Sequence, residues 1–559
     1  MTSAGRASNG WRATGLAVFS GVCSMLKTMR LTVNARPSIR HSAGALPQVR
    51  STSLGSRAGL RRRAYAALTA CGAGFRRCVL LACVFVFAGC AHYPANQPLD
   101  RHDPASGYRF TNLASPDEAD DMLVVVTFSG GGTRAAALAY GVLEHLARTE
   151  IVRQGKSGRL LDEVDILSSV SGGSFTAAYY ALYGERTFSD FESRFLKRNV
   201  QGELTRKQFA PINLARVSSP QFGRIDLVAE YLDDEIFDHA TFSDLITRGR
   251  RPFVMINASD MSLGTRFEFT QDQFDLLCSD LSSFPLARAV AASSAVPIVF
   301  SPLTVRNYGG KCGYHGPVQD AGNRRGPTAR QIYKAAEVRS YLDSEARPYL
   351  HLLDGGLTDN IGLRGMLDRV ASGDGPLDLA RAMRLERLRR AVLIVVNAET
   401  APDLSLDRRE AVPTITQVFR AVKDIPINRY SFETVELLKT NFEGWARQMR
   451  KRNEKQRADG EESGFDFYLV EVSFDAIKDP AERDFFRGIP TSYTLPAETV
   501  DRLRALGPRL IEESTDYQRL LHDLQLSDAS SSHGNEPAAS ATKSISGTPM
   551  PSWHRRPQF

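Results

Sequence analysis

The chain has 559 residues, of which 42% are hydrophobic and 24% charged, so it is long enough to bury a large core. Its formal net charge is +7, but the first 89 residues contain 13 Lys and Arg and no Asp or Glu. The remainder carries 57 basic and 63 acidic side chains and is mildly acidic. A nucleic-acid-binding protein needs a basic face on its folded part, so this distribution argues against nucleic acid as a partner.

The leader, residues 1–89, ends in a pattern typical of an export signal. Arg76 and Arg77 precede an apolar run over residues 78–88, which is too short to span a bilayer as a stable helix. The letters FAG then precede Cys90. An n-region is normally short, so one hypothesis is that residues 1–75 lie upstream of the true translation start.

The sequence FAGC resembles a bacterial lipobox, although Phe87 stands where Leu is usual. The resemblance implies that Cys90 is lipidated and becomes the mature N-terminus, which would attach the protein to a membrane. An ordinary secretory signal with a chance cysteine is the alternative. Ala91 follows the cysteine where an Asp would favour the inner membrane, so we expect an exported protein held in the bacterial outer membrane rather than the inner.

Five of the seven cysteines lie in the leader or at its end, which leaves Cys278 and Cys312 in the exported part. In an oxidising compartment these two would pair in a disulfide, and two free buried thiols are the alternative. Their spacing matches no zinc pattern, so we expect no metal site.

Composition divides the rest of the chain into three parts. Residues 90–120 are rich in Pro, Asp, Ala and Asn without periodicity, and they predict a tether between the membrane anchor and the fold. The folded part begins near Asp121, and residues 401–525 read as a helical and strand extension of the same unit. The Ser, Ala and Pro-rich residues 526–559 predict a disordered tail.

Strand and helix patterns alternate between residues 121 and 514. Continuous apolar strands separated by helices indicate an α/β fold of three layers, a mostly parallel central sheet with helices on both faces. The glycine-rich residues 305–347 show no period and read as an irregular excursion. We predict strands over 122–128, 165–170, 252–261, 348–354, 390–399 and 467–475, and helices over 133–147, 173–183, 227–237, within 285–303, 416–460 and 496–514.

The first strand meets the sequence SGGGTRAAA, a tight turn that opens a helix. Gly130, Gly132 and Ala135 fit the dinucleotide fingerprint G-x-G-x-x-G/A, so a nucleotide-phosphate site is one interpretation. The same clustered amides at a helix N-terminus would equally bind another anion, such as a transient oxyanion.

The second strand ends in SSVSGGS and runs directly into a helix. This is the strand–turn–helix setting of a nucleophile elbow, which holds the hydroxyl of Ser171 out on a sharp turn. A dinucleotide site would need Asp or Glu at this strand end to bind a ribose, and the chain has none there. Ser169 replaces the first glycine of the usual elbow pattern, and a plain helix cap is the alternative.

A serine nucleophile needs a base, and LHLLDGGLTDN places Asp354 at the end of a strand. His351 lies three residues earlier and therefore points to the opposite face of the strand. His522, His533 and His554, the histidines that follow Asp354, lie at or beyond the edge of the fold. A Ser–Asp dyad is the arrangement that remains, with a carboxylate that only binds turn amides as the alternative.

Four blocks in this order, SGGGTRAAALAYGVLEHL, SSVSGGS, ASSAVPIVFSPL and DGGLTDNIGL, resemble the patatin-like phospholipase family over residues 121–400. The resemblance implies a Ser–Asp dyad acting on acyl esters of lipids, with Ser171 as nucleophile and Asp354 as base. It also implies oxyanion-hole amides at Gly130, Gly131 and Gly132, no metal and no cofactor. Arg134 matches the arginine of the glycine block, where it would orient a substrate phosphate or simply be solvated.

These observations predict a lipid acyl hydrolase of the phospholipase A or lysophospholipase kind, with membrane lipids as substrates. A catalytically inactive, lipid-anchored binding protein that kept the fold is the alternative. A nucleotide-binding protein is a third reading, already weakened by the missing acidic residue. The sequence indicates no oligomeric state.

Overall fold

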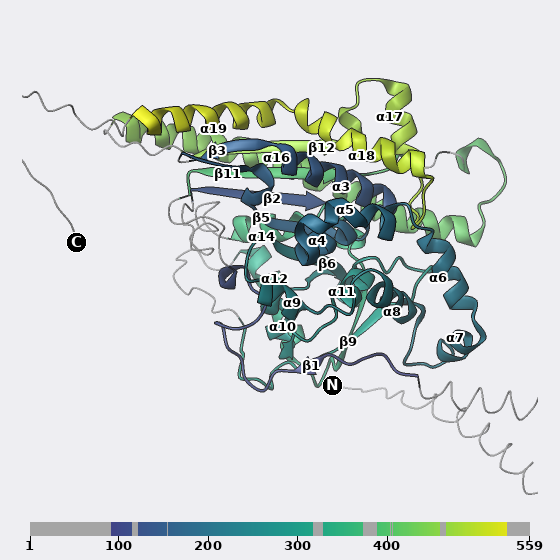
Figure 1. Ribbon diagram of the computed structural model, residues 1–559. Coiled ribbons are helices and arrows are strands. Elements are labelled where there is room, and N and C mark those ends of the chain that lie inside the picture. The colour runs from purple at the N-terminus through teal and green to yellow at the C-terminus, as the bar shows by residue number, and fades with distance from the viewer. Residues whose placement is uncertain are drawn as a thin grey trace, which may run out of the picture. The chain divides into compact units, whose positions relative to one another are not determined.

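A computed structural model gives the fold (Figure 1). The predictions about the leader, the lipidation of Cys90 and most of the tail lie outside the residues that it describes. Within the described ranges, no helix is both long and apolar enough to cross a membrane. The structure describes residues 91–113, 121–153, 155–316, 328–372, 388–402, 404, 406–458 and 465–533.

An eight-stranded sheet forms the centre of the fold, in the order β12-β11-β2-β5-β6-β10-β9 with β7 on β6. The five strands from β12 to β6 are parallel, and β10 and β9 close the sheet antiparallel. The strands are β2 (Met122–Phe128), β5 (Val164–Val170), β6 (Phe253–Asp260), β7 (Thr265–Glu268), β9 (Leu303–Arg306), β10 (Tyr349–Asp354), β11 (Arg390–Asn397) and β12 (Asp466–Ser473).

Helices cover both faces of this sheet, which confirms the three-layer α/β fold. Alternate side chains of β11 point to opposite faces, as strand geometry requires. Ile394 packs in the large core that contains α3 and α18, whereas Val395 packs with Val435 and Leu438 of α16 on the other face. The larger helices are α3 (Thr133–Arg148), α4 (Gly172–Tyr183), α6 (Val200–Phe209), α8 (Arg224–Glu235), α11 (Leu286–Ser293), α12 (Ala329–Leu342), α14 (Arg364–Ser372), α16 (Ile415–Ala458), α18 (Ala497–Glu512) and α19 (Thr515–His533).

The direction of β10 decides where Asp354 lies. Because β10 is antiparallel to β6, its last residue stops opposite Ala258, and the neighbouring residue of β6, Asn257, pairs with Val170 of β5. The end of β10 therefore meets the end of β5 from the opposite direction. Asp354 thus approaches Ser171 along a strand that runs opposite to β5, and not along one parallel to it.

The segment predicted as a tether is folded against the body over residues 91–113. Tyr108 is buried, and its hydroxyl accepts the amide proton of Val254 in the central sheet at 2.8 Å. Arg109 is also buried and donates to the carboxylate of Asp275 at 2.6 Å. The tether prediction is wrong for these residues, because their few large side chains insert singly and leave no periodic pattern.

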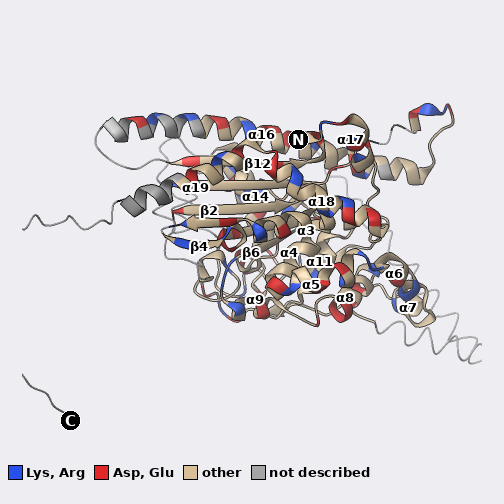
Figure 2. Cartoon of the chain, turned by 45° about the horizontal axis from the view of Figure 1, so that its top comes forward, with Lys and Arg blue, Asp and Glu red and all other residues tan. Residues whose placement is uncertain are grey.

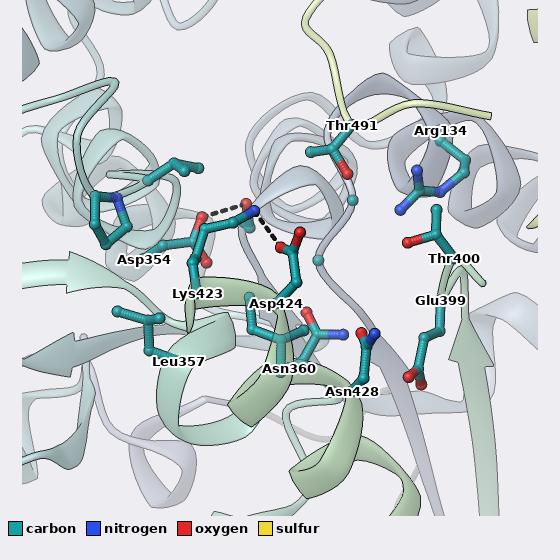
Figure 3. Close-up of a pocket in the computed structure, with 16 residues that line it drawn as sticks. Arg134, Asp354, Leu357, Asn360, Glu399, Thr400, Lys423, Asp424, Asn428 and Thr491 are labelled. Carbon is teal, nitrogen blue, oxygen red and sulfur yellow. Dashed lines mark hydrogen bonds and ion pairs between the residues drawn. The ribbon is translucent and has the colours of Figure 1, made fainter. Parts of the chain in front are cut away.

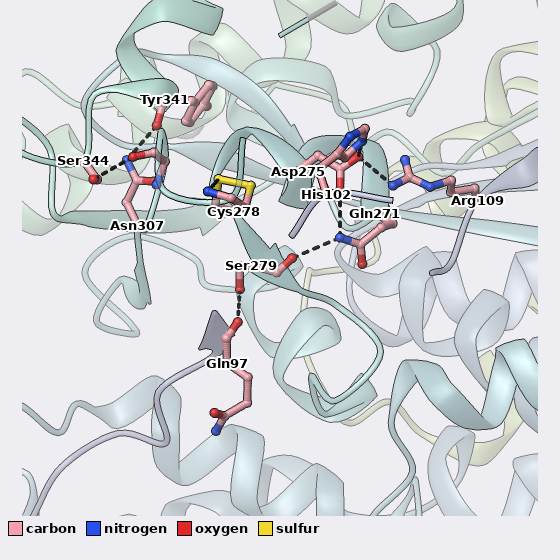
Figure 4. Close-up of a disulfide and its surroundings, with 12 residues drawn as sticks. Gln97, His102, Arg109, Gln271, Asp275, Cys278, Ser279, Asn307, Tyr341 and Ser344 are labelled. Atoms are coloured by element: carbon pink, nitrogen blue, oxygen red, sulfur yellow. Dashed lines mark hydrogen bonds and ion pairs between the residues drawn. A yellow bond between two sulfur atoms is a disulfide. The ribbon is translucent and has the colours of Figure 1, made fainter. Parts of the chain in front are cut away.

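Part of this segment lies beside a disulfide that joins Cys278 and Cys312, with Cα atoms 5.4 Å apart (Figure 4). The short strand β1 (Gln97–Pro98) pairs with β8 (Ser279–Asp280) immediately after Cys278. The amide of Leu99 donates to the carbonyl of Cys278, and that of His102 donates to the carbonyl of Cys312. The pairing that the sequence left open is thus present, and the N-terminal segment is bonded to both cysteines.

The C-terminal extension contributes to the central sheet and to both helical layers. Its strand β12 pairs with β11 in parallel over eight residues. Gly507 of α18 lies so close to α3 that an added Cβ would come within 3.0–3.2 Å of Leu138, Gly141 and Val142. The helix α19 ends at His533, so the predicted tail begins as a helix and its remainder lies outside the described residues.

Candidate active site

Ser171 occupies the turn between β5 and α4, as the elbow pattern predicts. Its φ of 48° and ψ of −117° are a conformation that non-glycine residues rarely adopt, and it is only 6% exposed. Gly172 permits this turn, because a Cβ at that position would lie 2.2 Å from the carbonyl oxygen of Gly132. The elbow and the glycine turn are therefore in direct backbone contact.

Ser293, the last residue of α11, fastens the elbow from the other side. Its hydroxyl accepts the amide proton of Ser171 at 2.8 Å and donates to the carbonyl of Asn257 at 2.6 Å. The carbonyl of Ser293 accepts the amide proton of Gly355 at 3.0 Å. One residue thus ties the turn of the serine to the turn that follows Asp354. The ASSAVP block contained it, but nothing in its spacing marked this role.

Asp354 ends β10 with its carboxylate against the serine. The hydroxyl of Ser171 donates to Oδ2 at 2.8 Å, and the amide of Gly356 donates to Oδ1 at 2.8 Å. Burial raises the pKa of Asp354 to about 6, although these two hydrogen bonds and the charge of Lys423 act to lower it. The structure brings the two predicted residues together, and the carboxylate is poised to accept a proton near neutral pH.

The three predicted oxyanion-hole glycines are not equivalent. The amide of Gly130 donates to the carbonyl of Asn360 at 3.0 Å, so it is occupied in binding the turn that follows Asp354. In this structure the Gly130 amide is therefore not free to bind an oxyanion. Among the described residues no acceptor binds the amides of Gly131 and Gly132, and Gly132 has a φ of 60° that favours glycine.

Gly172 offers a further amide that the sequence analysis missed. It is the first residue of α4, where the N–H groups have no partner within the helix, and it follows the serine directly. Elbow enzymes use the amide after the nucleophile for an oxyanion. The candidate donors are therefore the amides of Gly131, Gly132 and Gly172.

Arg134 is buried, which excludes the solvated interpretation. Its Nε donates to the carbonyl of Ala398 at 2.9 Å, and its Nη1 donates to that of Ile489. Burial lowers the pKa of Arg134 to about 10. Arg134 therefore joins the end of β11 to the loop before α18 and forms part of the cavity wall.

A cavity opens beside the serine. Figure 3 shows Asp354 and Leu357 on one side and Arg134, Thr400 and Glu399 on the other, with Lys423 and Asp424 between them. No histidine of the described residues lines it. The lining residues are Gly130, Gly131, Arg134, Ser171, Val296, Pro297, Asp354, Leu357, Asn360, Glu399, Thr400, Lys423, Asp424, Ile427, Asn428 and Thr491.

One charged pair of this lining, Lys423 and Asp424, comes from the region that the sequence left without a role. Lys423 on α16 forms a 2.6 Å ion pair with Asp424 and lowers the pKa of Asp354. Glu399, which follows β11, has its pKa raised to about 7 by burial, against the lowering effect of the hydrogen bond from Asn397 and the charges of Arg487 and Arg134. The polar, helix-prone pattern of residues 416–460 gave no signal for a cavity wall.

The four sequence blocks now have places in one site. A family model described as "Patatin-like phospholipase" matches residues 126–367. Comparison with curated proteins gave no match.

Three solved structures of one human protein are similar to this chain. Human GIVD cytosolic phospholipase A2 has a TM-score of 0.37 and 14% identity, over 74% of this chain and 63% of that one. Its complex with methyl γ-linolenyl fluorophosphonate has a TM-score of 0.35 and 14% identity, over 74% and 60%. The complex that also holds terbium chloride has a TM-score of 0.32 and 15% identity, over 74% and 61%. The chain thus spans less than two thirds of each.

The four blocks and the family match agree on the same part of the chain. Residues 126–367 match a patatin-like domain, and they lie within a fold of three α/β layers that also includes β11 and β12.

Proposed function

We propose that this protein is a serine acyl-ester hydrolase of the phospholipase A or lysophospholipase kind that acts on membrane lipids. One observation carries the proposal: the Ser171 hydroxyl, on a strained turn beside a cavity, donates a 2.8 Å hydrogen bond to the buried carboxylate of Asp354. The match to a phospholipase family model supports a lipid ester as the substrate.

The geometry supports a two-step reaction. Asp354 takes the proton of the Ser171 hydroxyl while Oγ attacks the ester carbonyl carbon, and the carbonyl oxygen becomes an oxyanion. The amides of Gly131, Gly132 and Gly172 stabilise this oxyanion. The C–O bond of the ester then breaks, and the leaving alcohol takes the proton from Asp354.

The second step removes the acyl group. Water gives a proton to Asp354 and attacks the acyl-serine, and the serine oxygen leaves with that proton. The products are a fatty acid and a lysolipid or free alcohol, and the dyad returns to its starting state. Loss of one oxyanion donor costs on the order of 10²–10³ in turnover, so the glycine turn matters nearly as much as the dyad.

The proposal also places the protein on a membrane through a lipid on Cys90, after export, in the outer membrane. The lipobox-like sequence before Cys90 supports it. The mass of the intact mature protein tests it: wild type should start at Cys90 with a diacylglyceryl and an acyl group, and Cys90→Ser should carry neither. A mature wild-type chain without added lipid mass would contradict the anchor.

Fluorophosphonate labelling tests the hydrolase directly. The wild-type chain should be labelled at one site, Ser171→Ala should not be labelled, and Ser189→Ala, a change at an exposed serine, should be labelled like wild type. A lipid panel read by mass spectrometry should show cleavage by wild type and none by Asp354→Asn. Cleavage that survives the Asn change would contradict the dyad, and a folded wild type without labelling would favour an inactive binding protein.

A further inference from the structure

The start of α16 exposes an apolar stripe that helices normally bury. Ile415, Val418, Phe419 and Val422 follow each other at the three- and four-residue spacing of one helix face. Their exposed fractions are 76%, 48%, 51% and 58%. An exposed apolar face of this kind marks a surface that contacts another apolar phase.

Two more segments expose large apolar side chains. Phe209 ends α6, and Ile212 and Leu214 follow on α7 (Pro211–Arg216); they are 65%, 64% and 46% exposed. Ile298 and Val299, in the turn after α11, are each 54% exposed. We call these three segments, around residues 209–214, 298–299 and 415–422, the mouth rim.

The mouth rim is continuous with the active-site cavity. Val296 and Pro297 line the cavity and directly precede Ile298, and Lys423 lines it directly after Val422. The side chain of Gln201 on α6 accepts from the hydroxyl of Ser492, next to the lining residue Thr491. Segments 298–299 and 415–422 therefore border the cavity that leads to Ser171, and α6, which ends at Phe209, begins beside it.

Basic side chains flank the mouth rim. Within residues 205–216 and 411–423 the charged side chains are all Lys or Arg, and Asp424, which pairs with Lys423, follows directly; α6 and α7 can be followed in Figure 2. Lys207 and Arg216 form ion pairs with acidic residues of α8, so the apolar side chains are the stronger feature. Apolar residues beside cations fit the surface of a bilayer that contains anionic lipids.

The first residues that the structure describes are bonded to the segment that follows α7. The carbonyl of Ala91 accepts a hydrogen bond from the hydroxyl of Ser219, three residues after the end of α7, at 2.6 Å. The amide of Tyr93 donates to the carbonyl of Gln221 at 2.9 Å. Ala91, which follows the residue proposed to carry a lipid, therefore lies beside the segment that follows α7.

We infer that the mouth rim docks onto the surface of a lipid bilayer and presents the active-site cavity to it. The apolar side chains enter the boundary between headgroups and acyl chains, and the nearby cations meet anionic headgroups. A lipid then passes from the bilayer into the cavity without crossing water. This inference rests on the proposed hydrolase function, because that function is what requires a lipid to enter there.

Vesicle binding tests the docking without catalysis. The full chain with Ser171→Ala and Cys90→Ser is mixed with vesicles of phosphatidylethanolamine and phosphatidylglycerol, and the bound fraction is measured by flotation. Phe209→Ser with Ile212→Ser, and separately Phe419→Ser with Val422→Ser, should each weaken binding by about tenfold or more, since each removes apolar area equal to two side chains. Ile332→Ser with Tyr333→Ser, on the exposed face of α12, should bind like the parent chain.

Hydrolysis separates this inference from the proposed function. In the active chain the mouth-rim variants should keep the wild-type rate on a soluble short-chain ester and lose rate on vesicles. Equal vesicle binding by all variants, or equal loss in the α12 control, would overturn the docking while leaving the hydrolase intact. A change of oligomeric state in the variants with unchanged vesicle binding would also overturn it, because it would show a surface between two copies. Absence of soluble-ester activity in wild type would instead refute the hydrolase.

Discussion

Asp354 combines burial with the role of a base, and that combination sets a pH dependence. Its pKa is raised to about 6, and only the ionised carboxylate can take the serine proton. We therefore predict that kcat/KM on a soluble ester falls as the pH drops below about 6 and levels off above it. A pH–rate profile measures this, and a rate unchanged between pH 5 and pH 8 would contradict the assignment.

Lys423 shifts that dependence. Its charge favours the ionised form of Asp354, so Lys423→Met should raise the pKa of the base and move the acidic limb of the profile to higher pH. Lys439→Met, on the same helix but paired with Glu471 at the edge strand, should leave the limb in place. If Lys439→Met also moved the acidic limb, the shift would reflect a general effect of changing a lysine on α16 and not the charge beside Asp354.

The same buried carboxylate should cost stability. A pKa raised from 3.8 to about 6 means that the folded state binds its proton more tightly than the unfolded chain, so ionisation destabilises the fold as the pH rises through this range. Asp354→Asn removes that cost, and at pH 8 we predict a gain of up to about 3 kcal/mol in the free energy of unfolding, since one pKa unit is about 1.4 kcal/mol. Urea unfolding at pH 3 and pH 8 checks it: below the unfolded pKa of 3.8 the carboxyl is protonated in both states, so the gain should be nearly absent at pH 3.

At the scale of elements, α11 acts as a brace between β5 and β10. Its terminal Ser293 binds the amide of Ser171, and its carbonyl binds the amide of Gly355. Ser293→Ala should misplace the nucleophile and lower kcat by roughly ten- to a hundredfold with little change in KM, because small displacements of reacting groups cost that much. Steady-state kinetics on a soluble ester separate the two constants. A rise in KM alone would assign Ser293 to substrate binding.

The strands, and the positions of Ser171 and Asp354 at strand ends, were predictable from sequence because their signals are local. Buried strands such as 122–128 are continuous apolar runs, and Ser171 and Asp354 each end a strand before glycines. The antiparallel entry of β10 was not predictable, since strand order depends on contacts far apart in the chain. The hydrogen bond that occupies the amide of Gly130 belongs to the same class, because its acceptor, Asn360, is 230 residues away.

Other elements were missed because their stabilising contacts are single or remote. The helix α12 lies in residues 305–347, which are rich in glycine and suggested an irregular excursion. Lys423 and Asp424 lie on a long helix whose polar sequence resembles a solvent-exposed one. Their place in the cavity wall follows from packing of α16 across the sheet, which no pattern within the helix encodes.

At the scale of the whole molecule, the disulfide closes a loop that contains α11. Cys278 and Cys312 are 34 residues apart, and Ser293 lies between them. Breaking the bond should lower the free energy of unfolding by about 3–4 kcal/mol through the entropy regained by the unfolded loop. Urea unfolding with and without reductant measures the loss. The variant with Cys278→Ala and Cys312→Ala should show a similar loss and no response to reductant.

If Cys90 carries the proposed lipid, the hydrogen bond between Ala91 and Ser219 limits which lipids the proposed active site can reach. An extended chain spans at most about 3.3–3.6 Å per residue, so a free tether of thirty residues would reach roughly 100 Å from its anchor. Because Ala91 is hydrogen-bonded to Ser219, just after α7, almost no free chain would separate a lipid on Cys90 from the folded body. The proposed active site would then reach lipids only in the leaflet that holds the anchor. A second membrane facing the protein across a gap would lie beyond its reach.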